Sequence, residues 1–194
     1  MSLINSKNDK ARLRQKCISI RKDMTSQEKS QKDTDIAEKL FKLWQYKRAA
    51  VVLCYVSMTL EVDTVSIIGQ ALKDGKRVAV PYCVPGTREM EFYFISSVGS
   101  LQKGAFGVLE PVPNCYNKVT DFAQSLCLVP AMCYDYEGYR VGYGKGYYDR
   151  FLIKYHGYKI GLCYRNCMTN KIHTNRFDQK VDVVVTDEKL YKLQ

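Results

Sequence analysis

The chain has 194 residues, of which 46% are hydrophobic and 26% are charged, and its formal net charge is +10. This composition is typical of a soluble globular protein with one core. It contains no apolar run near the about 18 residues of a membrane span, and its N-terminus lacks the apolar core of a secretory signal. We therefore expect one cytoplasmic domain over residues 1–194, without a membrane partner. The basic charge fits nucleic acid, a phosphorylated ligand or a small polyanion, and does not choose among them.

Two helices are predicted in the N-terminal part of the chain. Residues 10–21 form an amphipathic pattern, and Thr25 and Glu28 have the spacing of a capping box that opens a second helix. The expected apolar faces consist of Leu13, Cys17 and Ile20 in the first helix, and of Ile36, Leu40, Leu43 and Trp44 in the second. A basic helical hairpin can bind nucleic acid, but apolar faces favour two helices packed on a domain.

Strands and helices are predicted to alternate after residue 48. The apolar run at 49–56 is typical of a strand buried on both faces, as in a parallel sheet. Asp63 or Thr64 can cap a helix that ends at Asp74 and Gly75. Further strands are expected at 77–81, 89–95, 125–130, 159–164 and 181–186, a loop at 99–114, and a helix at 147–155. This alternation predicts an α/β fold with three layers, in which helices cover both faces of a mostly parallel sheet.

The eight cysteines are scattered along the chain. No CxxC pair occurs, and the closest two, Cys163 and Cys167, are four residues apart. Structural zinc usually requires two tight pairs, and a thiol inside an apolar run behaves as a small hydrophobic side chain. We expect neither a disulfide nor a metal role for them.

A glycine-rich stretch, GYRVGYGKGYYDRF at 138–151, stands between a predicted strand and a predicted helix. Ligands of open α/β sheets bind beyond the carboxyl ends of strands, where helix N-termini present free N–H groups. Glycines allow a close approach to an anion, and Arg140 and Lys145 add positive charge, so a phosphate site is plausible. The stretch matches neither a Walker A motif nor the dinucleotide fingerprint. A structural turn, or tyrosines that stack on RNA bases, remain alternatives.

Asp149 directly follows the GYGKGYY part of this stretch. Next to bound phosphates its carboxylate requires a cation, and Mg²⁺ is the usual one. An aspartate in the first turn of a helix also interacts favourably with the helix dipole, or pairs with a neighbour such as Arg150. Position alone leaves both interpretations open.

The segment PAMCYDYEGYRVGYGKGYYDRFL, residues 130–152, closely resembles the signature of the 5-formyltetrahydrofolate cyclo-ligase family, approximately P-G-x-x-F-D-x-x-G-x-R-x-G-x-G-x-G-Y-Y-D. The resemblance covers nearly the whole chain: it extends to Lys10 and Arg14, to VSMTLEVDT at 56–64, DGKRVAVP at 74–81, the pair Glu110-Pro111 and FDQKVDVVVTDE at 177–188. Departures from the family pattern are Ala131, Tyr134, Cys167 and His173.

The resemblance implies the fold and the reaction. The fold would be similar to the NagB/RpiA/CoA transferase-like fold. The enzyme would use ATP with Mg²⁺ to convert 5-formyltetrahydrofolate to 5,10-methenyltetrahydrofolate, ADP and phosphate, through a phosphorylated formyl group. It also implies 5-formyltetrahydrofolate and ATP as partners, and we expect a monomer that binds no nucleic acid.

The resemblance also implies roles for individual residues. ATP would be bound by Lys10, Arg14, Arg140, Gly142, Tyr143, Gly144, Lys145, Gly146, Tyr147, Tyr148 and Asp149. The folate would be bound by Val56, Met58, Glu61 and Tyr148, the catalytic residues would be Arg140, Lys145 and Tyr148, and Mg²⁺ would be held by Asp149 and Asp178. Two other classes stay open beside this one: a non-enzymatic RNA-binding domain, and another phosphate-ligand enzyme such as a sugar-phosphate isomerase or a CoA transferase.

Overall fold

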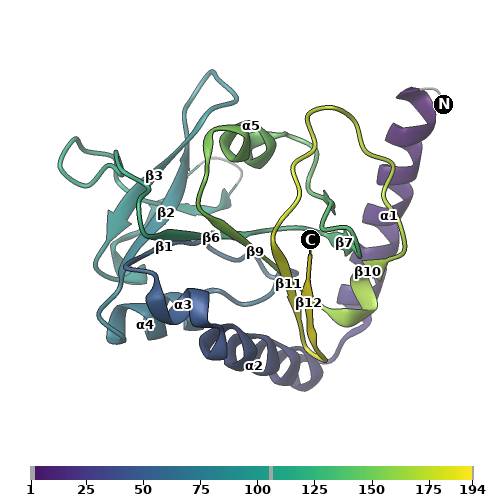
Figure 1. Ribbon diagram of the computed structural model, residues 1–194, viewed down its shortest axis with the longest axis horizontal. Coiled ribbons are helices and arrows are strands. Elements are labelled where there is room, and N and C mark those ends of the chain that lie inside the picture. The colour runs from purple at the N-terminus through teal and green to yellow at the C-terminus, as the bar shows by residue number, and fades with distance from the viewer. Residues whose placement is uncertain (1–2, 105–106, 194) are drawn as a thin grey trace.

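A seven-stranded sheet runs through the centre of the computed structural model, which describes residues 3–104 and 107–193 (Figure 1). Its strand order is β12-β11-β9-β6-β1-β2-β3. The bounds are β1 (Val51–Leu53), β2 (Arg77–Cys83), β3 (Met90–Ile95), β6 (Ser125–Val129), β9 (Tyr158–Cys163), β11 (Val183–Thr186) and β12 (Leu190–Lys192). The five inner strands are parallel, and the edge strands β3 and β12 pair antiparallel with their neighbours.

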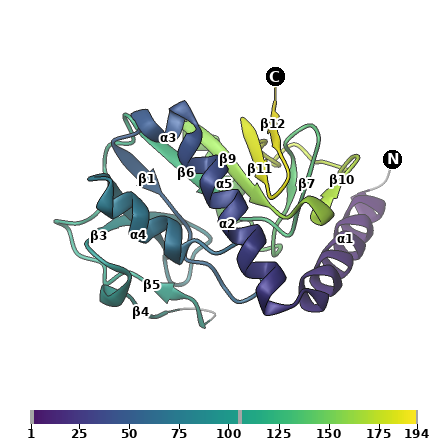
Figure 2. The same ribbon diagram turned by 90° about the horizontal axis from the view of Figure 1, so that it is seen from below.

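Helices cover both faces of this sheet. The helices α2 (Ser26–Lys42), α3 (Trp44–Arg48) and α4 (Val65–Lys73) lie on one face, and α5 (Tyr147–Lys154) lies on the other (Figures 1 and 2). Every residue of β1, β6 and β11 is buried, which is why their sequences are continuous apolar runs. The expected α/β architecture with a mostly parallel sheet is confirmed. Within the described ranges, no helix combines the length and apolarity needed to cross a membrane.

Helix α1 (Leu3–Asp23) packs at one end of the domain, beside a small second sheet (Figure 2). That sheet has the order β10-β7-β8 and consists of β7 (Cys133–Asp135), β8 (Arg140–Val141) and β10 (Met168–Thr169). Arg21 lies in the last turn of α1 and is buried. Its guanidinium donates to the carbonyls of Ala131 and Met132, each at 2.8 Å. These bonds join the helix to the segment that enters the small sheet.

The second helix begins as expected but ends early. The Thr25 hydroxyl accepts a hydrogen bond from the Glu28 amide at 3.1 Å, as in a capping box. However, Leu43 is extended, with ψ 133°, and separates α2 from α3. Trp44 therefore starts a new helix and is 58% exposed, with the guanidinium of Arg48 over its ring. The prediction that Trp44 belongs to the buried stripe is wrong, because one extended residue changes the direction of every side chain after it.

Several short elements differ from the expectation. The run at 49–56 contains a strand only at Val51–Leu53. The predicted loop at 99–114 holds a 3₁₀ turn, η1 (Val98–Ser100), and the paired strands β4 (Gln102–Lys103) and β5 (Leu109–Glu110). The short strands β7, β8, β10 and β12 were not predicted. Strands of two or three residues are too short to produce a readable alternation of polar and apolar residues.

The strand order places a crevice at the carboxyl ends of β1 and β6. From β1 the chain continues to β2 and β3 on one side, and it returns to β6 on the other side of β1. The connections after these two neighbouring strands diverge, and a topological switch point of this kind is the usual ligand site of open α/β sheets. The segments that leave it are 54–64 after β1 and 130–146 after β6.

Candidate functional site

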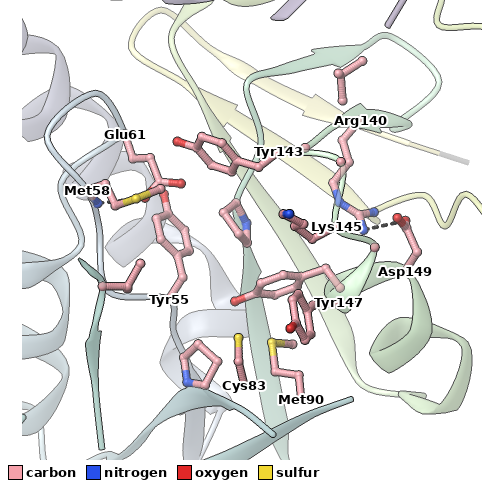
Figure 3. A pocket seen from close by; sticks show the side chains of 18 of the residues that line it. Tyr55, Met58, Glu61, Cys83, Met90, Arg140, Tyr143, Lys145, Tyr147 and Asp149 are labelled. Carbon is pink, nitrogen blue, oxygen red and sulfur yellow. Dashed lines mark hydrogen bonds and ion pairs between the residues drawn. The ribbon is translucent and has the colours of Figure 1, made fainter. Parts of the chain in front are cut away.

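A pocket of about 670 Å³ opens at this switch point (Figure 3), a size typical of small-molecule sites. Its walls come from the segments after β1 and β6, from β2 and β3, from α1 and from the residues near Asp178. All residues that the family resemblance assigned to the site line it: Lys10, Arg14, Val56, Met58, Glu61, Arg140, Gly142, Tyr143, Gly144, Lys145, Gly146, Tyr147, Tyr148, Asp149 and Asp178. The structure thus brings together residues that are far apart in the chain.

The glycine loop, residues 142–146, leads from β8 into the N-terminus of α5. Gly144 and Gly146 have φ of 92° and 75°, a region that a side chain disfavours. Gly146 is the N-cap of α5 and has no side chain that could cap the helix. The Nε of Arg14 donates to the Gly142 carbonyl at 2.6 Å and ties the loop to α1. The free N–H groups of the first turn can therefore receive an anion.

Arg140 and Asp149 form an ion pair at the start of α5 (Figure 3). The Nη2 of Arg140 lies 2.7 Å from Oδ1 of Asp149, and its Nη1 donates to the Gln179 carbonyl at 2.7 Å. Asp149 thus pairs with Arg140 rather than with Arg150, which donates to the Lys145 and Gly146 carbonyls. The Arg140 side chain is only 5% exposed, and the pairing holds its guanidinium beside the glycine loop.

Asp178 pairs with Lys10, and both line the pocket. The Lys10 ammonium lies 2.8 and 2.6 Å from the two carboxylate oxygens, and the Asn175 amide donates to one of them at 2.6 Å. Asp9, the residue before Lys10 in α1, contacts His173, with 2.6 Å between its Oδ2 and Nδ1 of the imidazole. These contacts join α1 to the segment before β11, and they show that His173 has a structural contact here.

The two aspartates alone do not form a closed metal cage. The described residues contain no cluster of three or more His, Cys, Asp or Glu side chains able to hold a metal ion. Mg²⁺ does not require such a cluster, because it is usually held by one or two carboxylates together with water and ligand phosphates. Asp149 and Asp178 both line the pocket and carry the hard oxygen atoms that this ion prefers, so the residues present fit Mg²⁺ that arrives with a phosphorylated ligand.

Glu61 is a buried carboxyl group that lies across the pocket from Asp149 in Figure 3. It is 4% exposed, and its Oε2 accepts a hydrogen bond from the Met58 amide at 2.8 Å. Burial raises the pKa of this carboxyl, whereas the Met58 amide and the Tyr143 side chain, which points toward it in Figure 3, lower the pKa. Tyr55 and Met58 lie beside Glu61 in Figure 3, and the apolar wall continues to Cys83 and Met90 next to Tyr147. A carboxylate in such a wall suits a flat ligand with adjacent N–H donors.

Tyr148 lies in the pocket wall with its hydroxyl buried. The hydroxyl oxygen has no hydrogen-bond partner among residues 3–104 and 107–193. Burial raises the pKa of Tyr148 well above its usual value, so the hydroxyl stays protonated and can donate. An unpaired buried hydroxyl costs roughly 1–3 kcal/mol.

Comparison with known proteins decides the family. A family model described as the 5-formyltetrahydrofolate cyclo-ligase family matches residues 6–187. The chain belongs to the 5-formyltetrahydrofolate cyclo-ligase family. Membership makes the protein a ligase, as the sequence resemblance predicted.

Relatives of this ligase include both sequences and solved structures. The probable 5-formyltetrahydrofolate cyclo-ligase of Schizosaccharomyces pombe is 31% identical over 173 residues, which cover 81% of this chain and 84% of the relative. The structure of Aquifex aeolicus 5,10-methenyltetrahydrofolate synthetase has a TM-score of 0.83 and 31% identity, and the match covers 95% and 93% of the two chains. The Mycoplasma pneumoniae synthetase has a TM-score of 0.74 at 24% identity, covers 92% and 99%, and supports the fold alone.

Part of the ligase's pocket wall was missed by the sequence analysis. These additional lining residues are Tyr55, Pro81, Cys83, Met90, Val108, Glu110, Pro130, Val141 and Asn175. Cys83 and Met90 face each other in the register of β2 and β3, and the Cys83 thiol interacts with Glu110. Apolar residues on strands look like core residues in a sequence. Four of them carried a signal, since Pro81, Glu110, Pro130 and Val141 belong to the segments that resemble the family.

Proposed function

We propose that this ligase uses ATP and Mg²⁺ to cyclise 5-formyltetrahydrofolate to 5,10-methenyltetrahydrofolate, with release of ADP and phosphate. The observation that carries the proposal is the two-ended character of the pocket. One end has the glycine loop, a helix N-terminus and cationic side chains, which suit a triphosphate. The other end has an apolar wall and the Glu61 carboxyl, which suit a pterin.

The chemistry explains why ATP is needed. The carbon of the N5-formyl group is a poor electrophile, and its oxygen is a poor leaving group. Transfer of the γ-phosphoryl group to that oxygen gives an iminium phosphate and ADP. The N10 amine then attacks the carbon, the C–O bond breaks with loss of phosphate, and N10 loses its proton. The protein's main tasks are to align the two substrates and to offset the developing negative charge.

The residues of the loop and of α1 perform these tasks in the proposal. The amides of residues 142–147, together with Lys10 and Arg14, bind the triphosphate. Arg140 and Lys145 neutralise the phosphoryl group as it transfers. Tyr148 lines the junction of nucleotide and folate. Asp149 and Asp178 would hold Mg²⁺, which supplies positive charge to the phosphates when it is bound.

The reaction itself is the first test. The purified protein is expected to form the methenyl product with one ADP and one phosphate for each ring closed, because one phosphoryl transfer activates one formyl oxygen. Folate product and ADP should be measured in the same samples, with and without ATP and Mg²⁺. Ring closure without ADP formation would overturn the phosphorylation step, and ATP hydrolysis without ring closure would indicate another acceptor. Neither activity, combined with salt-sensitive RNA binding, would favour the RNA-binding class.

A substitution at Glu61 tests which end of the pocket binds the pterin. Glu61→Gln replaces an acceptor oxygen with a donor of the same shape, so folate binding is expected to weaken by about 1–3 kcal/mol while ATP binding is unchanged. Titration calorimetry with each ligand checks this separation. An equal loss of affinity for both ligands would indicate a structural role for Glu61 instead.

The pH dependence of folate binding checks the same assignment. The raised pKa of Glu61 describes the ligand-free protein, and the N–H donors of a pterin bind the ionised form. Protons therefore compete with the folate, and affinity is expected to fall as the pH is lowered through that raised pKa. Glu61→Gln has no proton to bind at this position and should lose this part of the pH dependence.

Other properties of the protein stay predictions. These are a monomeric state, a cytoplasmic location, the absence of a nucleic-acid partner, and a fold similar to sugar-phosphate isomerases and CoA transferases.

A further inference from the structure

The segment that carries Glu61, residues 54–64, is closed on itself by hydrogen bonds; we call it the Glu61 loop. The Thr64 hydroxyl donates to the Tyr55 carbonyl at 2.6 Å and accepts from the Ser57 amide at 2.9 Å. Within the loop, the Glu61 amide donates to the Met58 carbonyl at 2.9 Å, and the Met58 amide donates to the Glu61 carboxylate. The carboxylate is thus coupled to the backbone of its own loop, so a shift of that backbone moves the carboxylate.

Three side chains hold the Glu61 loop from the side away from the pocket. Arg21 of α1 donates to the Leu60 carbonyl at 2.9 Å. The hydroxyl of Tyr164, just after β9, lies 3.2 Å from the Glu61 carbonyl. Asp33 of α2 accepts a hydrogen bond from the Asp63 amide at 3.2 Å. Backbone groups of Leu60, Glu61 and Asp63 are therefore anchored to elements distant in the sequence.

Tyr164 and Asp33 act together as one buried anchor. Tyr164 is fully buried, and its hydroxyl donates to Oδ1 of Asp33 at 2.7 Å. The same hydroxyl hydrogen is shared with the Glu61 carbonyl, the longer of its two contacts. Asp33 is in turn held by Lys29, one turn earlier in α2, at 2.6 Å. Neither Tyr164 nor Asp33 is among the described residues that line the pocket.

We propose that Tyr164 and Asp33 are positioning residues that set the place of the Glu61 carboxylate and thereby the affinity for the folate. The inference rests on the proposed function, because it concerns the ligand that Glu61 binds. A carboxylate that accepts two adjacent N–H groups is sensitive to small displacements, since both bonds depend on one orientation. Loss of the Tyr164 hydroxyl removes the anchor of the Glu61 carbonyl. It also removes one hydrogen bond to the Asp33 carboxylate, which then holds the Asp63 amide with only Lys29 to fix it.

Tyr164→Phe tests the proposal because it removes only the hydroxyl and keeps the buried ring. The dissociation constant of 5-formyltetrahydrofolate is expected to rise on the order of 10-fold, comparable to one lost hydrogen bond. The dissociation constant of a non-hydrolysable ATP analogue is expected to stay unchanged. Asp33→Asn should shift the folate constant in the same direction, and it provides a second variant if Tyr164→Phe does not fold.

Tyr46→Phe is the matched control. Tyr46 is also buried, and its hydroxyl also donates to an aspartate, Asp74, at 2.7 Å. It belongs to α3 and is not one of the described pocket residues. Both substitutions remove a tyrosine–aspartate hydrogen bond of the same length, although Asp74 is exposed and Asp33 is buried, and both are expected to lower thermal stability. Only Tyr164→Phe is expected to weaken folate binding, so a merely structural effect is separated from positioning.

A double-mutant cycle with Glu61→Gln decides whether Tyr164 acts through Glu61. In the Glu61→Gln background, Tyr164→Phe is expected to cause little further loss of folate affinity. An equal loss in both backgrounds, or an unchanged folate constant in folded Tyr164→Phe, would overturn the proposal. An unmodified protein that does not bind 5-formyltetrahydrofolate would instead overturn the proposed function, and the two failures are therefore distinguishable.

Discussion

Replacement of Arg140 by alanine is expected to lower kcat by on the order of 100-fold or more. The guanidinium is held at the pocket by the Asp149 carboxylate and the Gln179 carbonyl, each at 2.7 Å. In the proposed reaction it stabilises charge on the phosphoryl group only as that group transfers, and the loss should therefore affect kcat more than the KM for either substrate. Steady-state kinetics with ATP and folate varied in turn measures this difference.

Two further variants make the Arg140 result interpretable. Arg140→Lys keeps a positive charge but loses the planar pair of donors, so it should recover only part of the activity. Arg150→Ala removes a cation from the same helix that donates to the carbonyls of Lys145 and Gly146 and is not among the described pocket residues. It should keep kcat near that of the unmodified protein. Unchanged turnover in folded Arg140→Ala would remove Arg140 from the mechanism.

Asp149→Asn is expected to raise the Mg²⁺ concentration needed for half-maximal activity by on the order of 10-fold or more. The substitution keeps a carbonyl oxygen but removes the negative charge that a divalent cation prefers. Calorimetric titration of Mg²⁺ into the protein with a non-hydrolysable ATP analogue provides a readout that does not depend on turnover. Asp178→Asn should give a shift in the same direction, because the second carboxylate lines the same pocket.

Asp182→Asn is the control for the loss of an ion-paired carboxylate. Asp182 pairs with Lys159 at 3.3 Å and accepts from the Lys159 amide at 2.7 Å, and it is outside the set of described pocket residues. Its Mg²⁺ titration should match that of the unmodified protein. If Asp149→Asn gave the same titration as the unmodified protein, only the helix-dipole and ion-pair role of Asp149 would remain.

The architecture was predictable from local signals where those signals are strong. Continuous apolar runs indicated inner parallel strands, and the capping spacing of Thr25 and Glu28 placed the start of α2 correctly. Both depend on residues close together in the chain. The prediction that Trp44 is buried was wrong, because its exposure depends on the break in the helix at Leu43, and the hydrophobic periodicity does not reveal that break.

The site was only partly predictable. The glycine stretch indicated an anion site from its own residues, because glycine conformation and a helix N-terminus are local properties. The assignment of Lys10, Glu61 and Asp178 to the same site came from the family resemblance, and the structure places all of them in the pocket wall. The apolar wall at Cys83 and Met90 depends on the pairing of β2 with β3, so it became visible only in the fold.

The sequence by itself determined the parallel sheet, the glycine loop at the start of α5 and membership of the family, because each is written in contiguous residues. Only the tertiary structure decided the partners of the charged groups. Lys10 and Asp178 are separated by 168 positions, and Tyr164 and Asp33 by 131. A contact across such a separation depends on how the sheet and its helices pack, and no local pattern in either segment specifies it.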